Sequence, residues 1–408
     1  MIRSVTVVGA SLAGLSTVRA LRAGGYQGRI RVVGDEPHAP YDRPPLSKGV
    51  LTGLVPAADL ALLGAEDEVL GVDWLLGVRA VSLEPTGHRV GLANGSTLAA
   101  DAVVLATGAR ARRLPGTDGL AGVHVLRTLE DAVALREQLR TARALVVVGA
   151  GFIGAEVASS ARSLGLDVTV VETATTPLAG PLGEQMGAAC ALLHGDHGVR
   201  LRTGTAVAEL VGSSRVEAVD LVDGTRLPAD LVVVGIGAVP AVEWLAGSGL
   251  DVTGGVRTDA ACATAAPRVL AVGDCALSFD VHAGRPVRAE HWTHALQQPA
   301  AAAATLLGAP AAHTALPTSG RSSTACNCSS PGGSSRGTRS PWSRGPWPSA
   351  RSSRRTPGPG ASWPSWASAP QASSHAGAVG CAPRLRGGSS HGRDGASLVT
   401  VSCLALLG

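Results

Sequence analysis

The 408-residue chain has few aromatic residues, little charge and a single lysine, Lys48. Phe, Trp and Tyr account for 3% of the residues and charged residues for 16%, against 45% that are hydrophobic. This hydrophobic share excludes disorder of the whole chain, and a core must be packed from Val, Leu and Ala. Because no run of about 20 uncharged apolar residues occurs, we expect no membrane-spanning helix. A strand-like run follows Arg3 directly, which predicts that there is no signal peptide and that the protein is cytoplasmic.

Charge and composition divide the chain near residue 317. Residues 1–316 contain 25 basic and 30 acidic residues, whereas the rest contains ten arginines and one acid, Asp394. The C-terminal segment is rich in Ser, Arg, Gly and Pro and shows almost no hydrophobic periodicity. The length leaves room for two or three domains, and we expect residues 317–408 to be a disordered, low-complexity tail.

Two stretches combine a buried strand, a glycine loop and an amphipathic helix. The first has a strand at 4–8, helical spacing over 12–23 and a second strand at 30–33. The pattern recurs at 145–148, 152–164 and 168–171, and further buried strands are predicted at 102–106, 231–234 and 269–272. Turn signals at 94–95 and 223–224 predict hairpins. The order indicates an α/β protein with two Rossmann-type nucleotide-binding domains.

The first glycine loop reads Gly9-Ala10-Ser11-Leu12-Ala13-Gly14, with Ser11 in place of the second glycine of GxGxxG. In such a loop the backbone N–H groups approach a pyrophosphate at the positive end of the helix. Asp35-Glu36 follows the second strand, where a carboxylate accepts a hydrogen bond from a ribose hydroxyl. The alternative is a tight turn followed by a solvated acid.

The second loop, Gly149-Ala150-Gly151-Phe152-Ile153-Gly154, is a full match. Glu172 closes its second strand, and residues 173–175 include no arginine that could hold a 2′-phosphate. These residues predict NADH rather than NADPH as the nucleotide. A chain with two such loops usually holds FAD in one and a nicotinamide nucleotide in the other. The residues assigned to NAD are Gly149, Gly151, Phe152, Ile153, Gly154, Glu172, Gly235 and Gly237.

Residues 1–316 resemble the FAD-dependent, NADH-linked ferredoxin reductases of bacterial oxygenase systems, which are related to rubredoxin reductases and apoptosis-inducing factors. The resemblance is carried by the two loops and by Pro40-Tyr41-Asp42-Arg43-Pro44-Pro45-Leu46-Ser47-Lys48, Ala106-Thr107-Gly108, Gly273-Asp274 and Glu290-His291-Trp292. It implies electron transfer from NADH through FAD to a ferredoxin-type iron–sulfur protein, with neither nucleic acid nor a membrane as partner. It also implies a discontinuous FAD-binding domain, 1–108 and 239–316, and an NAD-binding domain at 109–238.

The resemblance further implies individual flavin contacts. Ala80 or Val81 would meet the adenine, Arg127 would lie by the pyrophosphate and Asp274 would bond the ribityl chain. Glu290 and Trp292 would lie near the contact between flavin and nicotinamide. The residues assigned to FAD are Gly9, Ser11, Leu12, Ala13, Gly14, Asp35, Glu36, Arg43, Lys48, Ala80, Val81, Thr107, Gly108, Arg127, Asp274, Glu290, His291 and Trp292.

Lys48 and Glu156 are the residues to which we assign a catalytic role. Lys48 is the one lysine among 35 basic residues, at a position where a compact ammonium would fit beside a flavin ring better than a planar guanidinium. Glu156 follows Gly154 by two residues and is expected to point into the cleft between the domains. We hypothesise that the two pair beside the isoalloxazine and stabilise the charge of the reduced flavin. The alternative is that Lys48 solvates the end of a loop.

The cysteines argue against a disulfide reductase. Such enzymes need a redox dithiol near the first nucleotide helix. Residues 1–316 contain Cys190, Cys262 and Cys275, none of which lies there. Cys275 is predicted to be a small buried residue. Two pairs of nearby histidines lack an evident third ligand, so we predict no metal site.

The resemblance stops near Leu316-Pro317, where a third domain should open with a run similar to Tyr-Phe-Trp-Ser-(Asp/Glu)-Gln-Tyr-Gly. We back-translate residues 318–325 with codons that the genetic code permits and read the result one nucleotide earlier. This reading gives such a run, and the same shift yields strand-like sequence further on. We hypothesise a single frameshift, in the gene or in its sequencing, at about residues 309–317. Its consequence would be an open flavin face, with weaker FAD retention, oxidase leakage and a damaged docking surface. The alternative is a true basic tail that binds RNA or DNA.

Two other functions remain open from the sequence. One is another FAD-dependent NADH oxidoreductase, such as a nitrite reductase subunit or an NADH oxidase. The other is a non-catalytic flavin-binding protein, a redox-dependent binding partner whose aberrant C-terminus prevents catalysis.

We expect resequencing of the locus across codons 309–317 to reveal one inserted or deleted nucleotide. The reason is that a shift of the reading frame by one nucleotide restores strand-like sequence in the segment that follows. An unchanged reading, together with binding of the purified protein to RNA or DNA, would instead support the basic tail.

Overall fold

The computed structural model describes residues 2–117 and 119–315. The predicted tail, 317–408, therefore lies outside the described residues, and of the segment predicted to hold the frameshift, 309–317, only 309–315 lie within them. Every strand and helix predicted within the described range is present, with ends that differ by at most one residue.

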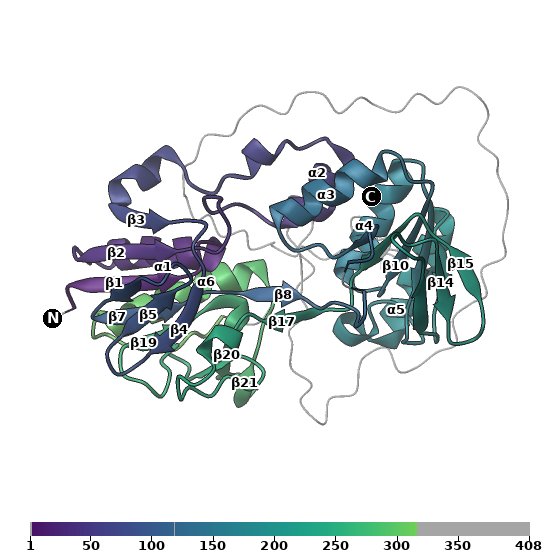
Figure 1. Cartoon of the computed structure of the whole chain (residues 1–408). Helices are drawn as coiled ribbons and strands as arrows, with labels where there is room; N and C mark the ends of the chain where they lie inside the picture. Colours follow the sequence, from purple (N-terminus) through teal and green to yellow (C-terminus); the bar gives the residue numbers. More distant parts are fainter. Residues whose placement is uncertain (1, 118, 316–408) are drawn as a thin grey trace, which may run out of the picture. The chain divides into compact units, whose positions relative to one another are not determined.

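The first sheet consists of five parallel strands, and the side chains of its first three strands are almost all buried. Its order is β19 (Val269–Ala271), β7 (Ala102–Leu105), β1 (Ser4–Val8), β2 (Arg29–Val33) and β3 (Val72–Leu75) (Figure 1). Such near-continuous apolar strands are typical of a parallel sheet that is covered on both faces. The sheet combines strands from the N-terminal part of the chain with β19, which follows much later.

The second sheet repeats this design with strands that lie between β7 and β19 in the sequence. Its parallel order is β12 (Arg200–Arg202), β11 (Asp167–Val171), β10 (Ala144–Val148), β16 (Leu231–Val234) and β9 (Val123–His124). The chain leaves the first sheet through β8 (Ala109–Ala111) and returns through β17 (Ala238–Pro240), and these two strands pair antiparallel (Figure 1).

The helices pack their apolar faces on the sheets and on one another. Helix α1 (Leu12–Ala23) buries Leu15, Val18 and Leu21 and contacts α6 (Trp292–Leu306). Helix α4 (Phe152–Ser163) takes the corresponding place after β10. The remaining helices are α2 (Gly49–Thr52), α3 (Leu129–Leu139), α5 (Ala179–Asp196), η1 (Pro44–Ser47), η2 (Ala57–Leu60), η3 (Ala65–Leu70), η4 (Glu243–Leu245) and η5 (Gly273–Cys275). None of the described helices is long and apolar enough to cross a lipid bilayer.

Short three-stranded sheets complete the described part. The hairpins predicted at 94–95 and 223–224 are confirmed: the first joins β5 (Arg89–Leu92) to β6 (Thr97–Ala99), and the second joins β14 (Ala218–Leu221) to β15 (Arg226–Pro228). These sheets are β4 (Ala80–Glu84), β5 (Arg89–Leu92) and β6 (Thr97–Ala99); β13 (Val207–Val211), β14 (Ala218–Leu221) and β15 (Arg226–Pro228); β18 (Val256–Thr258), β20 (Ala276–Asp280) and β21 (Arg285–Val287).

Candidate functional site

The first glycine loop brings the start of α1 against the ends of β1 and β7. Gly9 has φ +125°, and a Cβ there would lie 2.1 Å from the carbonyl oxygen of Ala106. A Cβ on Gly14 would lie 1.9 Å from the carbonyl oxygen of Gly9. Both positions therefore require glycine for the packing of the helix on the strands. Ser11, the N-cap of α1, makes no capping bond with its side chain, which leaves the hydroxyl facing a cavity.

The second loop has the same geometry with one informative difference. Gly149 has φ +101°, and its Cβ would lie 2.5 Å from the carbonyl oxygen of Gly235; a Cβ on Gly154 would lie 2.0 Å from that of Gly149. Gly151, the N-cap of α4, has an ordinary φ of −76°, and its Cβ would have no atom within 4 Å. Neither its backbone conformation nor a neighbour requires glycine at 151. The open space beside it fits a phosphate group at the helix N-terminus.

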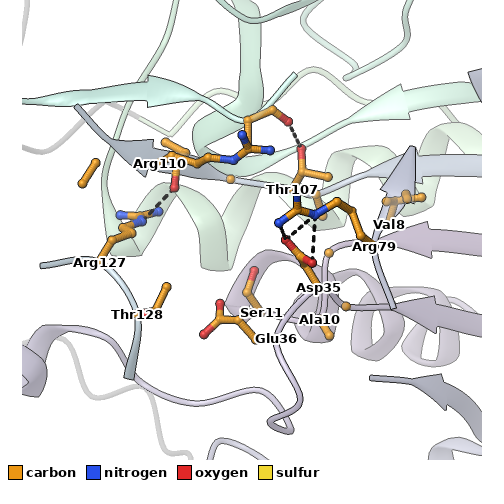
Figure 2. Close-up of a pocket in the computed structure, with 18 of the residues that line it drawn as sticks. Val8, Ala10, Ser11, Asp35, Glu36, Arg79, Thr107, Arg110, Arg127 and Thr128 are labelled. Carbon is orange, nitrogen blue, oxygen red and sulfur yellow. Dashed lines mark hydrogen bonds and ion pairs between the residues drawn. The ribbon is translucent and has the colours of Figure 1, made fainter. Parts of the chain in front are cut away.

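A cavity of about 680 Å³ opens beside the first loop (Figure 2). Its volume is in the range of cofactor sites. At one side Asp35 pairs with Arg79, with nitrogen–oxygen distances of 3.0–3.1 Å, and Arg127 lies at the opposite side. The predicted residues that line this cavity are Gly9, Ser11, Asp35, Glu36, Arg43, Ala80, Thr107, Gly108 and Arg127.

Tyr41, Arg43 and Glu36 form a hydrogen-bonded cluster at this cavity. The Tyr41 hydroxyl donates to Glu36 Oε2 at 2.5 Å, and Arg43 Nη2 lies 2.6 Å from Glu36 Oε1. Arg43 also donates to the carbonyl oxygen of Arg127 at 2.7 Å. Burial is the main reason that the pKa of Tyr41 lies well above its usual value, so the phenol remains a donor. Glu36 therefore keeps its carboxylate in place at the end of β2.

A second cavity, of about 150 Å³, shares Ser11, Arg43 and Arg127 with the first. Here Arg127 Nη2 lies 2.8 Å from Asp274 Oδ2, and its Nε donates to the carbonyl oxygen of Ala109 at 2.9 Å. The predicted residues that line this cavity are Ser11, Leu12, Ala13, Arg43, Gly108, Arg127, Asp274, Glu290, His291 and Trp292. Residues predicted from eight separate segments thus meet at adjoining cavities.

The predicted pair of Lys48 and Glu156 forms, with Nζ and Oε1 2.9 Å apart. Glu156 is almost fully buried, and Ser47 Oγ donates to its Oε2 at 2.5 Å. Lys48 also donates to the carbonyl oxygen of Pro44 at 3.3 Å. The pair lines a third cavity, of about 540 Å³, whereas Pro44 lines the cavity that holds Asp274. Lys48 therefore lies one turn of η1 away from Pro44, which lines the second cavity.

The acid of the second loop lies where the sequence predicts. Glu172 Oε2 accepts the backbone N–H of Ala150 at 2.7 Å, and Oε1 accepts that of Ala174 at 2.9 Å. These bonds hold the carboxylate next to the glycine loop, at the carboxyl end of β11. Gly235 packs behind the loop through its contact with Gly149, and Gly237 has φ +99°.

The two residues predicted as alternatives for the adenine contact lie differently, and two residues of the cavities are absent from the predicted set. Ala80 lines the first cavity, whereas Val81 is 45% exposed and does not. The pairing of β4 with β5 shifts register between Ala80 and Ser82, which interrupts the alternation of side chains along the strand. Arg79 and Tyr41 were not assigned to the site. Tyr41 stands in a motif that signalled the flavin edge, but nothing in the sequence distinguishes Arg79 from the other arginines.

The cysteines among the described residues, Cys190, Cys262 and Cys275, are buried, and Cys262 and Cys275 are free thiols. The prediction that Cys275 is a buried residue is confirmed. Burial raises the pKa of the Cys275 thiol and raises that of Cys262 to about 12, so both are held as unreactive thiols at neutral pH.

The family model described as "Pyridine nucleotide-disulphide oxidoreductase" matches residues 3–299, and the chain belongs to this family of oxidoreductases. The chain is 41% identical over 320 residues to the biphenyl dioxygenase system ferredoxin–NAD(+) reductase component of Paraburkholderia xenovorans, covering 78% of each protein. It is 39% identical over 313 residues to the putidaredoxin reductase of Pseudomonas putida, covering 75% of this chain and 74% of that protein.

Solved structures give the same result. The reductase in a covalent putidaredoxin reductase–putidaredoxin complex matches with a TM-score of 0.73 at 38% identity, covering 77% of this chain and 78% of that chain. The ferredoxin reductase for the CYP199A2 system of Rhodopseudomonas palustris matches with a TM-score of 0.74 at 36% identity and the same coverage. The resemblance to ferredoxin reductases and the fold class predicted from the sequence are thereby confirmed.

Proposed function

We propose that this chain is an FAD-dependent NADH oxidoreductase that reduces a ferredoxin-type iron–sulfur protein. The observation that carries the proposal is the pair of equivalent glycine loops, each with an acid at the end of the next strand, in a chain whose relatives are named ferredoxin–NAD(+) reductases. When bound, NADH supplies a hydride and FAD converts it into single electrons.

The two adjoining cavities are the proposed FAD site. Ser11 and the start of α1 would receive the pyrophosphate, and Glu36 the adenosine ribose. Ala80 would meet the adenine, and Asp274 the ribityl chain. Arg127, held by Asp274 and the Ala109 carbonyl, would add positive charge beside the phosphates. Except for Arg127, these residues lie within the proposed discontinuous FAD-binding domain, 1–108 and 239–316.

The second loop is the proposed NADH site, within a domain formed by 109–238. Gly151 leaves room for the pyrophosphate at the start of α4. The Glu172 carboxylate would accept a ribose hydroxyl and repel a 2′-phosphate, which favours NADH over NADPH. A cytoplasmic location is part of the proposal, because free thiols such as Cys262 and Cys275 suit a reducing compartment.

Lys48 and Glu156 are the proposed electrostatic residues of the reaction. Glu156 is desolvated and depends on the ammonium of Lys48 and the hydroxyl of Ser47 for its compensation. The carbonyl of Pro44 fixes the ammonium toward the segment that lines the second cavity. We propose that this pair sets the local charge where the flavin ring binds.

A visible spectrum of the purified full chain tests the function. We expect bound FAD, with added FAD where the isolated protein has lost it, and loss of the flavin absorbance at about 450 nm when NADH is added without oxygen. Reduced flavin that then reduces an iron–sulfur protein supports the proposal. Turnover with nitrite or oxygen alone would favour one of the other reductases. Bound FAD that NADH does not bleach would favour a non-catalytic flavoprotein. A chain that binds no FAD would refute the proposal.

Gly151→Ala should weaken NADH binding without unfolding the protein. The new methyl group occupies the space proposed for the pyrophosphate, while φ at 151 tolerates alanine. We expect KM for NADH to rise at least about tenfold, with the melting temperature and FAD content unchanged. Gly195→Ala in α5, whose Cβ also meets no atom within 4 Å, is the matched control. An unchanged KM, or equal kcat/KM for NADH and NADPH in the parent chain, would contradict the nucleotide assignment.

Lys48→Arg should slow flavin reduction although the positive charge is retained. A planar guanidinium cannot reproduce the contacts of the ammonium with Glu156 and the Pro44 carbonyl. We expect a decrease of about tenfold in the reduction rate, measured by stopped-flow absorbance. Arg140→Lys, an equally conservative exchange in an exposed ion pair, should have no effect. If Lys48 only solvates a loop end, its variant will reduce flavin at the parent rate.

A further inference from the structure

Gln298 is a buried polar residue in α6, a helix rich in alanine. It lies in α6, which precedes the end of the described chain, and its side chain is completely buried. The residue before it, Gln297, is exposed. A buried amide is costly unless both its ends are hydrogen-bonded, so the partners of Gln298 define its role.

Both ends of the Gln298 amide have partners. Its Oε1 accepts the backbone N–H of Gly273 at 2.7 Å, which fixes the orientation of the amide because that N–H can only donate. Its Nε2 donates to Ser278 Oγ at 2.7 Å. Ser278 Oγ lies 2.8 Å from Thr258 Oγ1, which lies 3.1 Å from the carbonyl oxygen of Asp259. One buried chain of hydrogen bonds therefore links α6, β20 and β18 to Gly273.

Gly273, at the end of this chain of hydrogen bonds, begins the turn that carries Asp274. Gly273 has φ +71°, and a Cβ there would lie 2.9 Å from the Cβ of Ala13 in α1. Asp274 follows, with its carboxylate 2.8 Å from Arg127 at the second cavity. The position of Asp274 thus depends on a left-handed residue whose N–H is bound by Gln298.

We propose that Gln298 is a positioning residue of the flavin site, which acts through Asp274 without touching the cofactor. The inference rests on the proposed function in assigning Asp274 to the ribityl chain. The Gln298 amide locks the Gly273–Cys275 turn against α1 and α6, and the turn holds the Asp274 carboxylate toward Arg127 and the cofactor.

Hydrogen exchange of the cofactor-free full chain tests the positioning itself. In Gln298→Leu the Gly273 N–H loses its acceptor, so its exchange should accelerate at least about tenfold. Gln297→Leu, the same exchange at the exposed neighbour, should leave it unchanged. The Val147 amide in β10 is the internal reference, because general destabilisation would accelerate both. Unchanged exchange at Gly273, or equal acceleration at both sites, overturns the proposal.

A double-mutant cycle tests the route through Asp274. We expect Gln298→Leu and Asp274→Ala each to raise the FAD dissociation constant about tenfold, and the double variant to raise it about tenfold rather than about a hundredfold. Independent, multiplicative losses would show that Gln298 has only a general structural role and would overturn the proposal. A parent chain that binds no FAD would refute the proposed function instead, while the exchange measurement would still decide whether Gln298 holds the turn.

Discussion

The close approach of each nucleotide helix to its strand is the constraint on which the rest of the structure depends. At both loops a glycine Cβ would lie about 2 Å from a carbonyl oxygen, so no other residue permits the approach. The approach places the N-terminus of α1 and of α4 at the carboxyl ends of parallel strands. The acids that follow β2 and β11 reach the same edges. Two sheets with the same geometry thereby create two equivalent sites from unrelated side chains.

The two sites differ in the residues that surround each glycine loop. The first loop has Ser11 at the N-cap and is surrounded by a cluster in which Tyr41 and Arg43 fix Glu36. The second has Gly151 at the N-cap, and its acid, Glu172, is fixed by the backbone of the loop itself. A cofactor that remains bound suits the first arrangement, with its many charged contacts. A nucleotide that enters and leaves at each turnover suits the second, with its open glycine.

The sequence predicts the elements better than the contacts of the site. Apolar runs at 4–8 and 145–148 and the glycine loops that follow them predict the fold, because a parallel strand and its helix are specified by local pattern. The pairing of Asp35 with Arg79 could not be predicted, since one arginine among many becomes distinctive only through its strand. Ala80 and Val81 could not be separated either, because a register shift in β4 decides which side chain faces inward. The role of Gln298 could not be predicted from its helix, because its hydrogen-bond partner, Gly273, lies 25 residues away in the sequence.

The ion pair between Lys48 and Glu156 also has a mechanical consequence. It joins α4, which packs on the second sheet, to the segment that runs through η1 and α2, and Ser160 reinforces the joint by donating to the Ser47 carbonyl at 2.7 Å. Separating these elements would break the ion pair that compensates the buried carboxylate of Glu156. Because η1, α2 and α4 also contribute to one hydrophobic cluster, we expect this segment and α4 to move as a single rigid unit during substrate exchange.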